Sequence, residues 1–338
     1  MRSMRFDNRW AAVLLVSLFS FGPSVQSSDR QILVYQKKYI MGTVFEIAAY
    51  SGSSEQASFA IEKAFHEIVR IDDLMSNYKP ESALSHLNQS AHFHAESVPP
   101  DLYCVIQQAV QFSKLSDGKF DITVAPLVNL WKAALLGDSI PSAAQQQQAE
   151  ACVGYEKIAL TPPDQISFQS ACLQLDLGAL GKGYAVDRAV ATLYSLGIYN
   201  AFINAGGSTI FAMGSPPGQT SWLVHLRDPS HKVGPYVMLS NESVSTSEQS
   251  SASLLGRDSA GHIIDPATGR PLKTEFAVSV IARTATLSDG LSTTLLLLGP
   301  MQGKSLVNRT PDTSAIWLSP KAQIETAIYG PQILFGKL

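Results

Sequence analysis

The chain reads Ser288-Asp289-Gly290-Leu291-Ser292-Thr293-Thr294 near its C-terminus, and an apolar run follows this stretch up to Gly299. The pattern predicts a helix whose first turn carries oxygen donors and whose remainder is buried. Asp289 and Thr293 stand four residues apart, so they share one face of that helix. A carboxylate and a hydroxyl stacked in this way suit Mg²⁺ or Ca²⁺, which prefer oxygen ligands. Alternatively, Asp289 only complements the positive end of the helix dipole, and Thr293 has no role in binding.

The composition sets limits on the fold and on the ligands. Of 338 residues, 45% are hydrophobic and 16% are charged, which is enough for one large domain or two closely packed ones. The formal net charge of −3 gives no electrostatic reason to expect a nucleic-acid partner. An anionic ligand must therefore be held locally, by a cation, a few side chains or backbone N–H groups.

The N-terminal residues have the pattern of a secretory signal peptide. Arg2, Arg5 and Arg9 precede an apolar stretch over residues 10–22, and small residues lead to a cleavage site near Ser28. The stretch is shorter than the roughly 20 apolar residues that span a bilayer. We therefore expect a signal peptide over residues 1–27, a functional domain over residues 28–338, and a protein that is exported, periplasmic and soluble after cleavage. A retained N-terminal membrane anchor is the alternative.

The three cysteines, Cys104, Cys152 and Cys172, are too few for a disulfide scaffold. Cys152 and Cys172 could pair in an oxidising compartment. Three buried and inert thiols are the alternative, because unpaired cysteine often behaves as a small apolar side chain.

Strand-like and helix-like segments alternate after the signal. The periodicity predicts helices over residues 57–75, from residue 100 onward, around residues 145–148, and from residue 182 or 183 to just before Gly197. Predicted extended segments cover residues 32–50 with a turn at 41–43, 157–168 as a hairpin, 201–213, 221–226, 236–239, 276–282, 313–318 and 324–329. Many strands are adjacent in sequence, which favours an α+β fold over a doubly wound sheet.

A glycine-rich turn is predicted where Leu175-Asp176-Leu177-Gly178-Ala179-Leu180-Gly181-Lys182-Gly183 joins a strand to a helix. Glycines let the backbone approach a ligand closely, and a helix N-terminus presents N–H groups to phosphate. The spacing matches neither a Walker loop nor a dinucleotide-binding fingerprint. Ordinary turn chemistry is the alternative, although it does not account for Lys182 in the first helical turn.

Two further segments carry candidate chemistry. His262 lies just before the turn signals Asp265-Pro266 and Thr268-Gly269, where an imidazole could act as a general base. A purely structural histidine is the alternative. Residues 117–131 predict a turn, a short extended run and the start of an apolar helix.

Taken together, these segments resemble the FAD:protein FMN transferases, the ApbE-like flavin transferases. The matching pieces follow the family's order from about Lys38 to the C-terminus: 41–43, 74–78, 117–131, 176–187, 204–207, 262–271 and 288–299. The resemblance implies an α+β fold of the T-fold kind, with mixed sheets, packed helices and a cleft for FAD between two halves.

The resemblance also implies a reaction. A threonine hydroxyl of a target flavoprotein attacks the FMN-side phosphorus of FAD, and AMP leaves. The expected acceptor is a membrane-associated electron-transfer subunit, and the expected cofactor is Mg²⁺, held by Asp289, Thr293 and the backbone carbonyl of Ala179. By the same resemblance His262 is the catalytic base. The positions implied to contact FAD are Met41, Tyr78, Phe120, Asp121, Ile122, Asp176, Lys182 and Ile264.

One segment departs from the family pattern. The family has Thr-Ser-Gly followed by Tyr and Arg, whereas residues 245–251 place Glu248 at the glycine and lack both partners. A glutamate would be strained if this position adopts positive φ, and it would repel a diphosphate if this position touches the ligand. Arg257 could partly replace the missing basic residue. Two other functions therefore stay open: a Mg²⁺-dependent FAD pyrophosphatase, in which Glu248 could assist water, and a non-catalytic FAD-binding protein.

Overall fold

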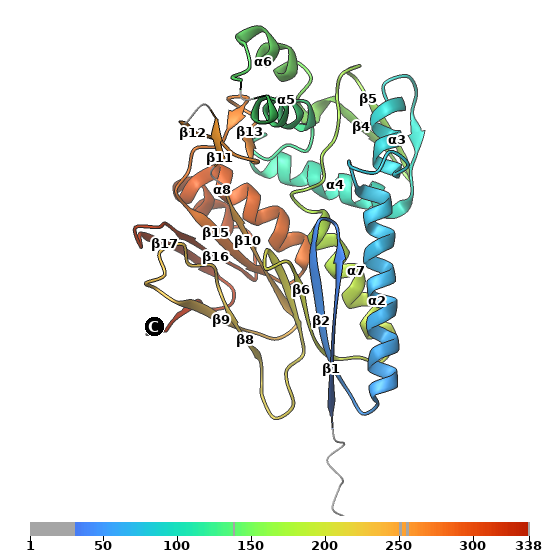
Figure 1. Ribbon diagram of the computed structural model, residues 1–338, viewed down its shortest axis with the longest axis vertical. Helices are drawn as coiled ribbons and strands as arrows, with labels where there is room; N and C mark the ends of the chain where they lie inside the picture. Colours follow the sequence, from blue (N-terminus) through green and yellow to red (C-terminus); the bar gives the residue numbers. More distant parts are fainter. Residues whose placement is uncertain (1–30, 138, 250–251, 255–256, 337–338) are drawn as a thin grey trace, which may run out of the picture.

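An eight-stranded sheet runs through the centre of the computed structural model, with every neighbouring pair of strands antiparallel (Figure 1). Its strands in spatial order are β1 (Ile32–Ile40), β2 (Thr43–Ser51), β6 (Asn200–Ala205), β7 (Thr209–Met213), β10 (Glu242–Glu248), β15 (Ala277–Ala282), β16 (Thr313–Leu318) and β17 (Ile324–Tyr329). The structure describes residues 31–137, 139–249, 252–254 and 257–336, with only the backbone between 252 and 260. The predicted signal peptide and its cleavage site lie outside the described residues.

Three long helices pack together against this sheet: α2 (Ser54–Met75), α7 (Gly181–Ser195) and α8 (Ala285–Val307). On α2, Ile61, Phe65 and Ile68 recur at helical spacing and are buried, which is why the sequence folds as an amphipathic helix here. The side chain of Ser53 caps the start of α2 by accepting a hydrogen bond from the N–H of Gln56 at 3.2 Å. These helices form one layer over the sheet.

The opposite face of the sheet is covered by a smaller sheet of β8 (Trp222–His225), β9 (Pro235–Leu239) and β18 (Leu334–Phe335). Strand β16 contributes side chains to the cores on both faces of the sheet, because successive side chains of a strand point to opposite faces. Ala315 and Trp317 belong to the main core under the helices. Ile316 and Leu318 belong to the second core, shared with β8 and β9.

A second group of elements gathers beyond one end of the large sheet, at the top of Figure 1. Its helices are α3 (Ala83–Ser90), α4 (Pro100–Leu115), α5 (Ala125–Leu136) and α6 (Ala143–Glu150). Its short strands are β3 (Glu96–Ser97), β4 (Ile158–Thr161), β5 (Gln165–Phe168), β11 (Ala252–Leu254), β12 (Arg257–Ala260), β13 (Ile264–Asp265) and β14 (Arg270–Pro271). A 3₁₀ turn, Tyr155–Lys157, precedes β4.

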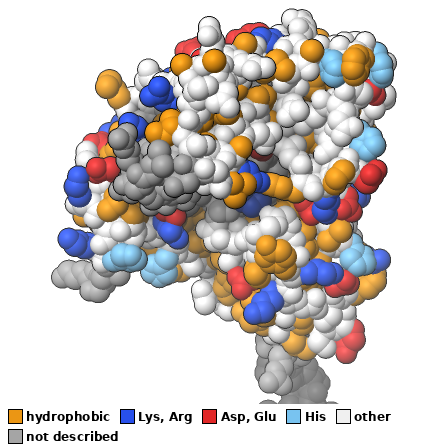
Figure 2. Space-filling view, turned by 45° about the horizontal axis from the view of Figure 1, so that its top comes forward, with side chains coloured by type: hydrophobic (Ala, Val, Ile, Leu, Met, Phe, Trp, Pro, Cys, Tyr) orange, Lys and Arg blue, Asp and Glu red, His pale blue; other side chains and the backbone are white. Residues whose placement is uncertain are grey.

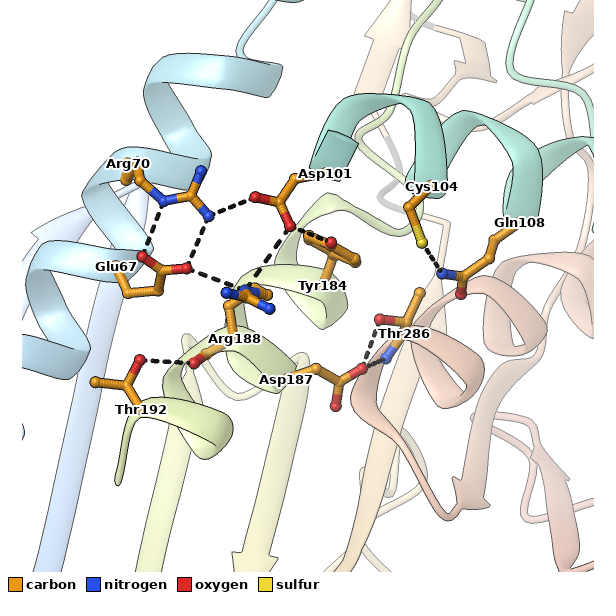
Figure 3. A network of polar contacts seen from close by, with 10 residues as sticks. All are labelled: Glu67, Arg70, Asp101, Cys104, Gln108, Tyr184, Asp187, Arg188, Thr192 and Thr286. Atoms are coloured by element: carbon orange, nitrogen blue, oxygen red, sulfur yellow. Dashed lines mark hydrogen bonds and ion pairs between the residues drawn. The ribbon is translucent and has the colours of Figure 1, made fainter. Parts of the chain in front are cut away.

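A charged network ties α4 of this second group to α2 and α7 (Figure 3). Arg70 bridges Glu67 at 2.7 Å and Asp101 at 2.6 Å, and Arg188 Nε lies 3.0 Å from Glu67 Oε1. The hydroxyl of Tyr184 donates to Asp101 at 2.5 Å. The hydrogen bond from Arg70 holds the pKa of Glu67 below its usual range, although partial burial opposes this. The network fixes α7, whose first turn faces the candidate site.

Most predicted elements are confirmed, and the differences include the following. Residues 201–213 form not one extended run but the hairpin β6–β7, because Gly206 and Gly207 adopt φ values of +63° and +74° and turn the chain. Strand β10 and helix α3 were not expected, since neither segment shows a clear apolar period. Helix α8 continues past Gly299, but the φ of +69° at that residue interrupts it before Pro300.

Cys152 and Cys172 form a disulfide, so of the two alternatives left open by the sequence the structure has the paired one and not the three thiols. Cys104 is unpaired and half-buried. Across the part of the chain that the structure describes, none of the helices combines the length and the apolar character needed to cross a bilayer.

Candidate active site

A pocket of about 560 Å³ lies where the end of the large sheet meets the second group of elements. Of the residues singled out in the sequence, all except Met41 line this pocket. Apolar side chains line one part, including Val124 and Val128, while the hairpin turn after β6 and the end of β10 line another. Figure 2 shows a hollow between the two parts of the molecule, with hydrophobic and basic side chains around it. The fold thus brings together segments that are far apart in sequence.

The predicted oxygen donors of α8 face the pocket. Asp289 is buried and Thr293 is partly exposed one turn later, and both side chains line the cavity. The start of α8 is held by Asp187 of α7, whose carboxylate accepts hydrogen bonds from the N–H groups of Ala285 and Thr286 at 2.7 and 2.8 Å. Figure 3 shows the contact of Asp187 with Thr286. A carboxylate at a helix N-terminus satisfies free N–H groups and the helix dipole. Asp187 therefore fixes the helix that carries Asp289.

Helices α7 and α8 touch through a glycine. The N–H of Gly183 donates to Asp289 Oδ2 at 2.9 Å. A Cβ at residue 183 would lie 2.3 Å from the carbonyl oxygen of Ala285, so no other residue fits without moving the helices apart. Burial raises the pKa of Asp289, while the positive charge of Lys182 and the N–H of Gly183 oppose this rise. The glycines of this turn were predicted to permit close approach to a ligand, and what Gly183 permits in the structure is close approach of the two helices.

The turn before α7 presents backbone and charge to the cavity. Asp176 Oδ1 accepts the N–H of Gly178 at 2.7 Å, and the N–H of Asp176 donates to the carbonyl of Ile122 at 2.7 Å. Ala179 and Lys182 line the same pocket next to this turn. The N-terminus of α7 therefore faces the cavity beside a lysine, an arrangement that attracts phosphate.

The segment 120–122 forms a wall of the pocket. Phe120 is buried edge-on against Phe112, with ring centroids 5.7 Å apart. The carboxylate of Asp121 accepts hydrogen bonds from the N–H of Thr123 at 2.8 Å and the N–H of Tyr155 at 2.9 Å. Burial raises the pKa of Asp121, which these hydrogen bonds partly offset. The side chain of Asp121 thus shapes the wall by binding the backbone N–H groups of Thr123 and Tyr155, in addition to any contact with a ligand.

Two predicted ligand contacts lie at different places. Tyr78 is 81% exposed at the mouth of the pocket, and the ammonium of Lys132 lies 4.7 Å from its ring centroid. Met41 is not among the pocket-lining residues. Its φ of +51° places it in the turn between β1 and β2, and its Cε would lie 3.7 Å from a Cβ on Gly181. Met41 therefore supports the start of α7 in this conformation.

His262 lies in the segment before β13 and lines the pocket. Part of its side chain is accessible. Partial burial by the surrounding protein disfavours the charged form and lowers the pKa of the imidazole below 6.5, and the charge of Lys182 lowers it further. The carboxylate of Glu248 acts in the opposite direction. An accessible imidazole that is neutral at neutral pH can accept a proton.

The segment that departs from the family pattern has a defined conformation at Glu248. Glu248 is the last residue of β10, paired with Ala277 of β15, and it is not among the residues with positive φ. The condition under which a glutamate would be strained is therefore not met at this position. Its carboxylate forms a two-pronged ion pair with Arg227, with atoms 2.5 and 3.0 Å apart, at the pocket wall. Arg227 is the basic partner here, and the side chain of Arg257 lies outside the described residues.

The donor set fits a small, hard cation. Asp289 offers a buried carboxylate, Thr293 a hydroxyl and Ala179 a carbonyl, all in one pocket. A cation beside Asp289 would favour its charged form, which burial disfavours. Among the described residues, no group of three or more His, Cys, Asp or Glu side chains is arranged so that it could hold a metal ion. Metal binding here would therefore depend on mixed oxygen donors and water, as Mg²⁺ commonly does.

A model of the ApbE family matches residues 41–317. The chain belongs to the ApbE family. The FAD:protein FMN transferase of Treponema pallidum is 27% identical to it, over 85% of this chain and 85% of the relative. The FAD:protein FMN transferase of Escherichia coli is 27% identical, over 92% and 95%. The apo structure of the flavinyl transferase ApbE from Pseudomonas stutzeri superposes with a TM-score of 0.76 at 26% identity, covering 88% of this chain and 96% of that one.

The family resemblance and the mixed α+β fold are thus confirmed. Sequence reasoning did not find three pocket features of this ApbE-family chain: the Arg227–Glu248 pair, the contact of Ser247 with Thr293, and the wall formed by Leu297. The hydroxyls of Ser247 and Thr293 are 3.0 Å apart across 46 positions. No local pattern indicates such contacts, because they depend on which strand ends beside α8.

Proposed function

We propose that this chain is an exported, Mg²⁺-dependent FAD:protein FMN transferase that moves FMN from FAD to a threonine hydroxyl of a target flavoprotein and releases AMP. The observation that carries the proposal is the convergence of three segments in one pocket. These are the Asp289–Thr293 pair, the turn with Ala179 and Lys182, and His262. The relatives that share most of this chain's length carry the same activity in their names.

The pocket suits the two chemically different parts of FAD. Phe120, Ile122, Val128 and Ile264 supply an apolar wall for a flavin ring. Next to it, Lys182 in the first turn of α7 supplies positive charge for a diphosphate, and the positive end of the helix dipole adds to it. Tyr78 at the mouth offers an aromatic face for stacking.

Asp289, Thr293 and the carbonyl of Ala179 would hold Mg²⁺. When bound, the ion supplies charge neutralisation at the diphosphate, which assists departure of AMP. The chain's contribution is rigidity, because Asp187 fixes the start of α8 and Gly183 holds one carboxylate oxygen of Asp289. Fixed donors need little reorganisation during the reaction.

His262 is the proton acceptor. The lowered pKa keeps its imidazole neutral at neutral pH, so it can take the proton of the incoming threonine hydroxyl. A bond forms between the threonine oxygen and the FMN-side phosphorus. The bond from that phosphorus to the bridging oxygen breaks, and AMP leaves with the bridging oxygen and its electron pair. The proton stays on His262 until solvent or product removes it.

Export and the acceptor follow from other features. The basic and apolar pattern before residue 28 supports secretion, and a paired Cys152–Cys172 suits an oxidising compartment. The acceptor is a flavoprotein with an accessible threonine, expected to be a membrane-associated electron-transfer subunit. The pyrophosphatase alternative loses its specific support, because Arg227 engages the Glu248 carboxylate that would activate water.

Intact-mass analysis tests the proposal. The chain from Ser28 onward is incubated with FAD, Mg²⁺ and a candidate acceptor domain, and the matched control is an acceptor whose threonine is replaced by valine. We expect the acceptor to gain one FMN and AMP to appear in equal amount, with no gain in the control. Free FMN and AMP with a series of unmodified acceptors would instead support the pyrophosphatase. Intact bound FAD would support a binding protein.

A further inference from the structure

The side chain of Gln249, directly after β10, forms hydrogen bonds with the segment that carries His262. Its side-chain nitrogen donates hydrogen bonds to the carbonyls of Ile263 and Leu272 at 2.9 and 3.0 Å. Its side-chain oxygen accepts the N–H of Ile263 at 3.1 Å. Both polar groups of the amide are therefore used, and they hold both sides of the residue that follows His262.

These bonds close the base of a hairpin. Strands β13 and β14 pair Ile264 with Pro271, and the N–H of Leu272 donates to the carbonyl of Ile263 at 2.9 Å. Gln249 joins that last pair from the sheet side. The hairpin thus continues from the end of the large sheet, with His262 at the junction.

The turn at the tip of the same hairpin is held by side chains of two helices. The indole N–H of Trp131 donates to the carbonyl of Gly269 at 2.7 Å, and the side chain of Gln146 donates to the carbonyl of Thr268 at 3.0 Å. These bonds come from α5 and α6. The hairpin is therefore anchored at both ends, and Gln249 supplies the anchor next to His262.

There is little room for another arrangement at this base. A Cβ on Gly261 would lie 2.2 Å from the side-chain carbon of the Gln249 amide. The amide therefore packs directly on the backbone just before His262 and bonds to the backbone just after it. Such a fit sets the direction in which the chain enters residue 262.

We propose that Gln249 is a positioning residue for His262, fixing the imidazole at the reacting centre. The inference rests on the proposed function, in which His262 accepts the threonine proton. Without the amide, the hairpin keeps its anchors on α5 and α6 but can shift at the end that carries His262. A displacement of about 1 Å at a reacting group can cost about 10²-fold in rate.

The central variant is Gln249→Glu, which keeps the shape but cannot donate to the two carbonyls at neutral pH. The matched control is Gln146→Met, which removes a hydrogen bond from the same hairpin at its far end. We expect Gln249→Glu to lower kcat for FMN transfer about 10- to 100-fold, with the Kd for FAD changed less than about 3-fold. The control should change both constants less than about 3-fold. If Gln249→Glu unfolds, Gln249→Met takes its place.

A double-mutant cycle separates positioning from general damage. If Gln249 acts through His262, Gln249→Glu combined with His262→Ala should transfer FMN as slowly as His262→Ala alone. Two losses that multiply would overturn the proposal, as would a weakened FAD affinity with unchanged kcat.

A readout without turnover keeps the two proposals apart. The ring carbon–hydrogen NMR signal of His262, assigned by its loss in His262→Ala, should shift or split in Gln249→Glu and stay in place in Gln146→Met. An unchanged signal in Gln249→Glu would reject the positioning role even if activity fell. Wild-type transfer by His262→Ala would reject His262 as the base, while the NMR comparison would still decide whether Gln249 positions it.

Discussion

The backbone N–H of Gly183 donates a hydrogen bond to Asp289 Oδ2 at 2.9 Å, although the two residues are 106 positions apart. Helices α7 and α8 meet at this point, and the missing side chain of residue 183 allows the contact. One glycine thus joins α7 to the helix that carries the candidate metal ligands. Stability and metal binding should therefore respond together to changes here.

Gly183→Ala tests this joint role. The new methyl group would meet the carbonyl of Ala285, so we expect a loss of about 1–3 kcal/mol in the free energy of unfolding. Mg²⁺ affinity, measured by calorimetry, should fall as Asp289 moves. The control is Gly181→Ala on the same helix, where the nearest atom would be Met41 Cε at an ordinary 3.7 Å. Equal effects of the two substitutions would contradict the role of the close contact.

Asp289→Asn should abolish metal-dependent transfer while leaving the fold intact. The amide keeps the volume of the buried side chain but removes its charge, so we expect at least about a 10²-fold loss of transfer at limiting Mg²⁺. Calorimetry should show no Mg²⁺ binding in the same range. Asp312→Asn is the control, since that carboxylate is exposed and pairs with Arg283. Wild-type transfer by Asp289→Asn at limiting Mg²⁺ would remove Asp289 from the metal site.

The Arg227–Glu248 pair should tune FAD binding through its charge. Glu248→Gln leaves an uncompensated guanidinium beside the pocket, so we expect FAD to bind about 2- to 5-fold more tightly at low salt. The gain should shrink as ionic strength rises. Flavin fluorescence measures the Kd directly. Glu275→Gln, which breaks an exposed pair with Lys321 away from the pocket, should leave it unchanged. Weaker binding by Glu248→Gln would show that the pair orders the pocket instead.

The protonation of His262 can be followed by NMR without substrate. Its folded-state pKa lies below 6.5, so the native chain binds fewer protons than the unfolded chain between the two pKa values. Stability from this group therefore rises with pH across that window and is constant above it. We expect Glu248→Gln to lower the midpoint and Lys182→Met to raise it, because these charges act in opposite directions. A midpoint above 6.5 in the wild-type chain would contradict this environment.

The disulfide should stabilise the pocket wall. Cys152 and Cys172 are 20 residues apart, and a loop of this size typically contributes about 3 kcal/mol to the free energy of unfolding. Cys152 also precedes Gly154, whose N–H donates to Thr123 at 2.7 Å in that wall. Cys172→Ser should therefore lower the melting temperature and raise KM for FAD. Cys104→Ser serves as the control, and an equal effect from it would argue against a specific role of the bridge.

Short-range patterns predicted much of the fold. The apolar spacing of residues 57–75 gave a helix because side chains one turn apart must share a buried face. The glycines and lysine of residues 178–183 gave a strand-to-helix turn, which the structure places at the start of α7. Strand β10 was missed because its buried positions include the serines Ser243 and Ser245, which bond to Ser288 instead of following an apolar alternation.

Sequence patterns were sufficient to predict that Asp289 and Thr293 lie on one face of a helix, that a glycine-rich turn precedes Lys182, and that the chain resembles the ApbE family. Those features depend on neighbours within one or two helical turns or on ordered motifs. The folded chain was needed to show that Arg227 pairs with Glu248, that Gln249 bonds to Ile263, and that Gly183 contacts Asp289. Each of these contacts joins segments whose meeting depends on packing and strand order, and no local rule specifies that.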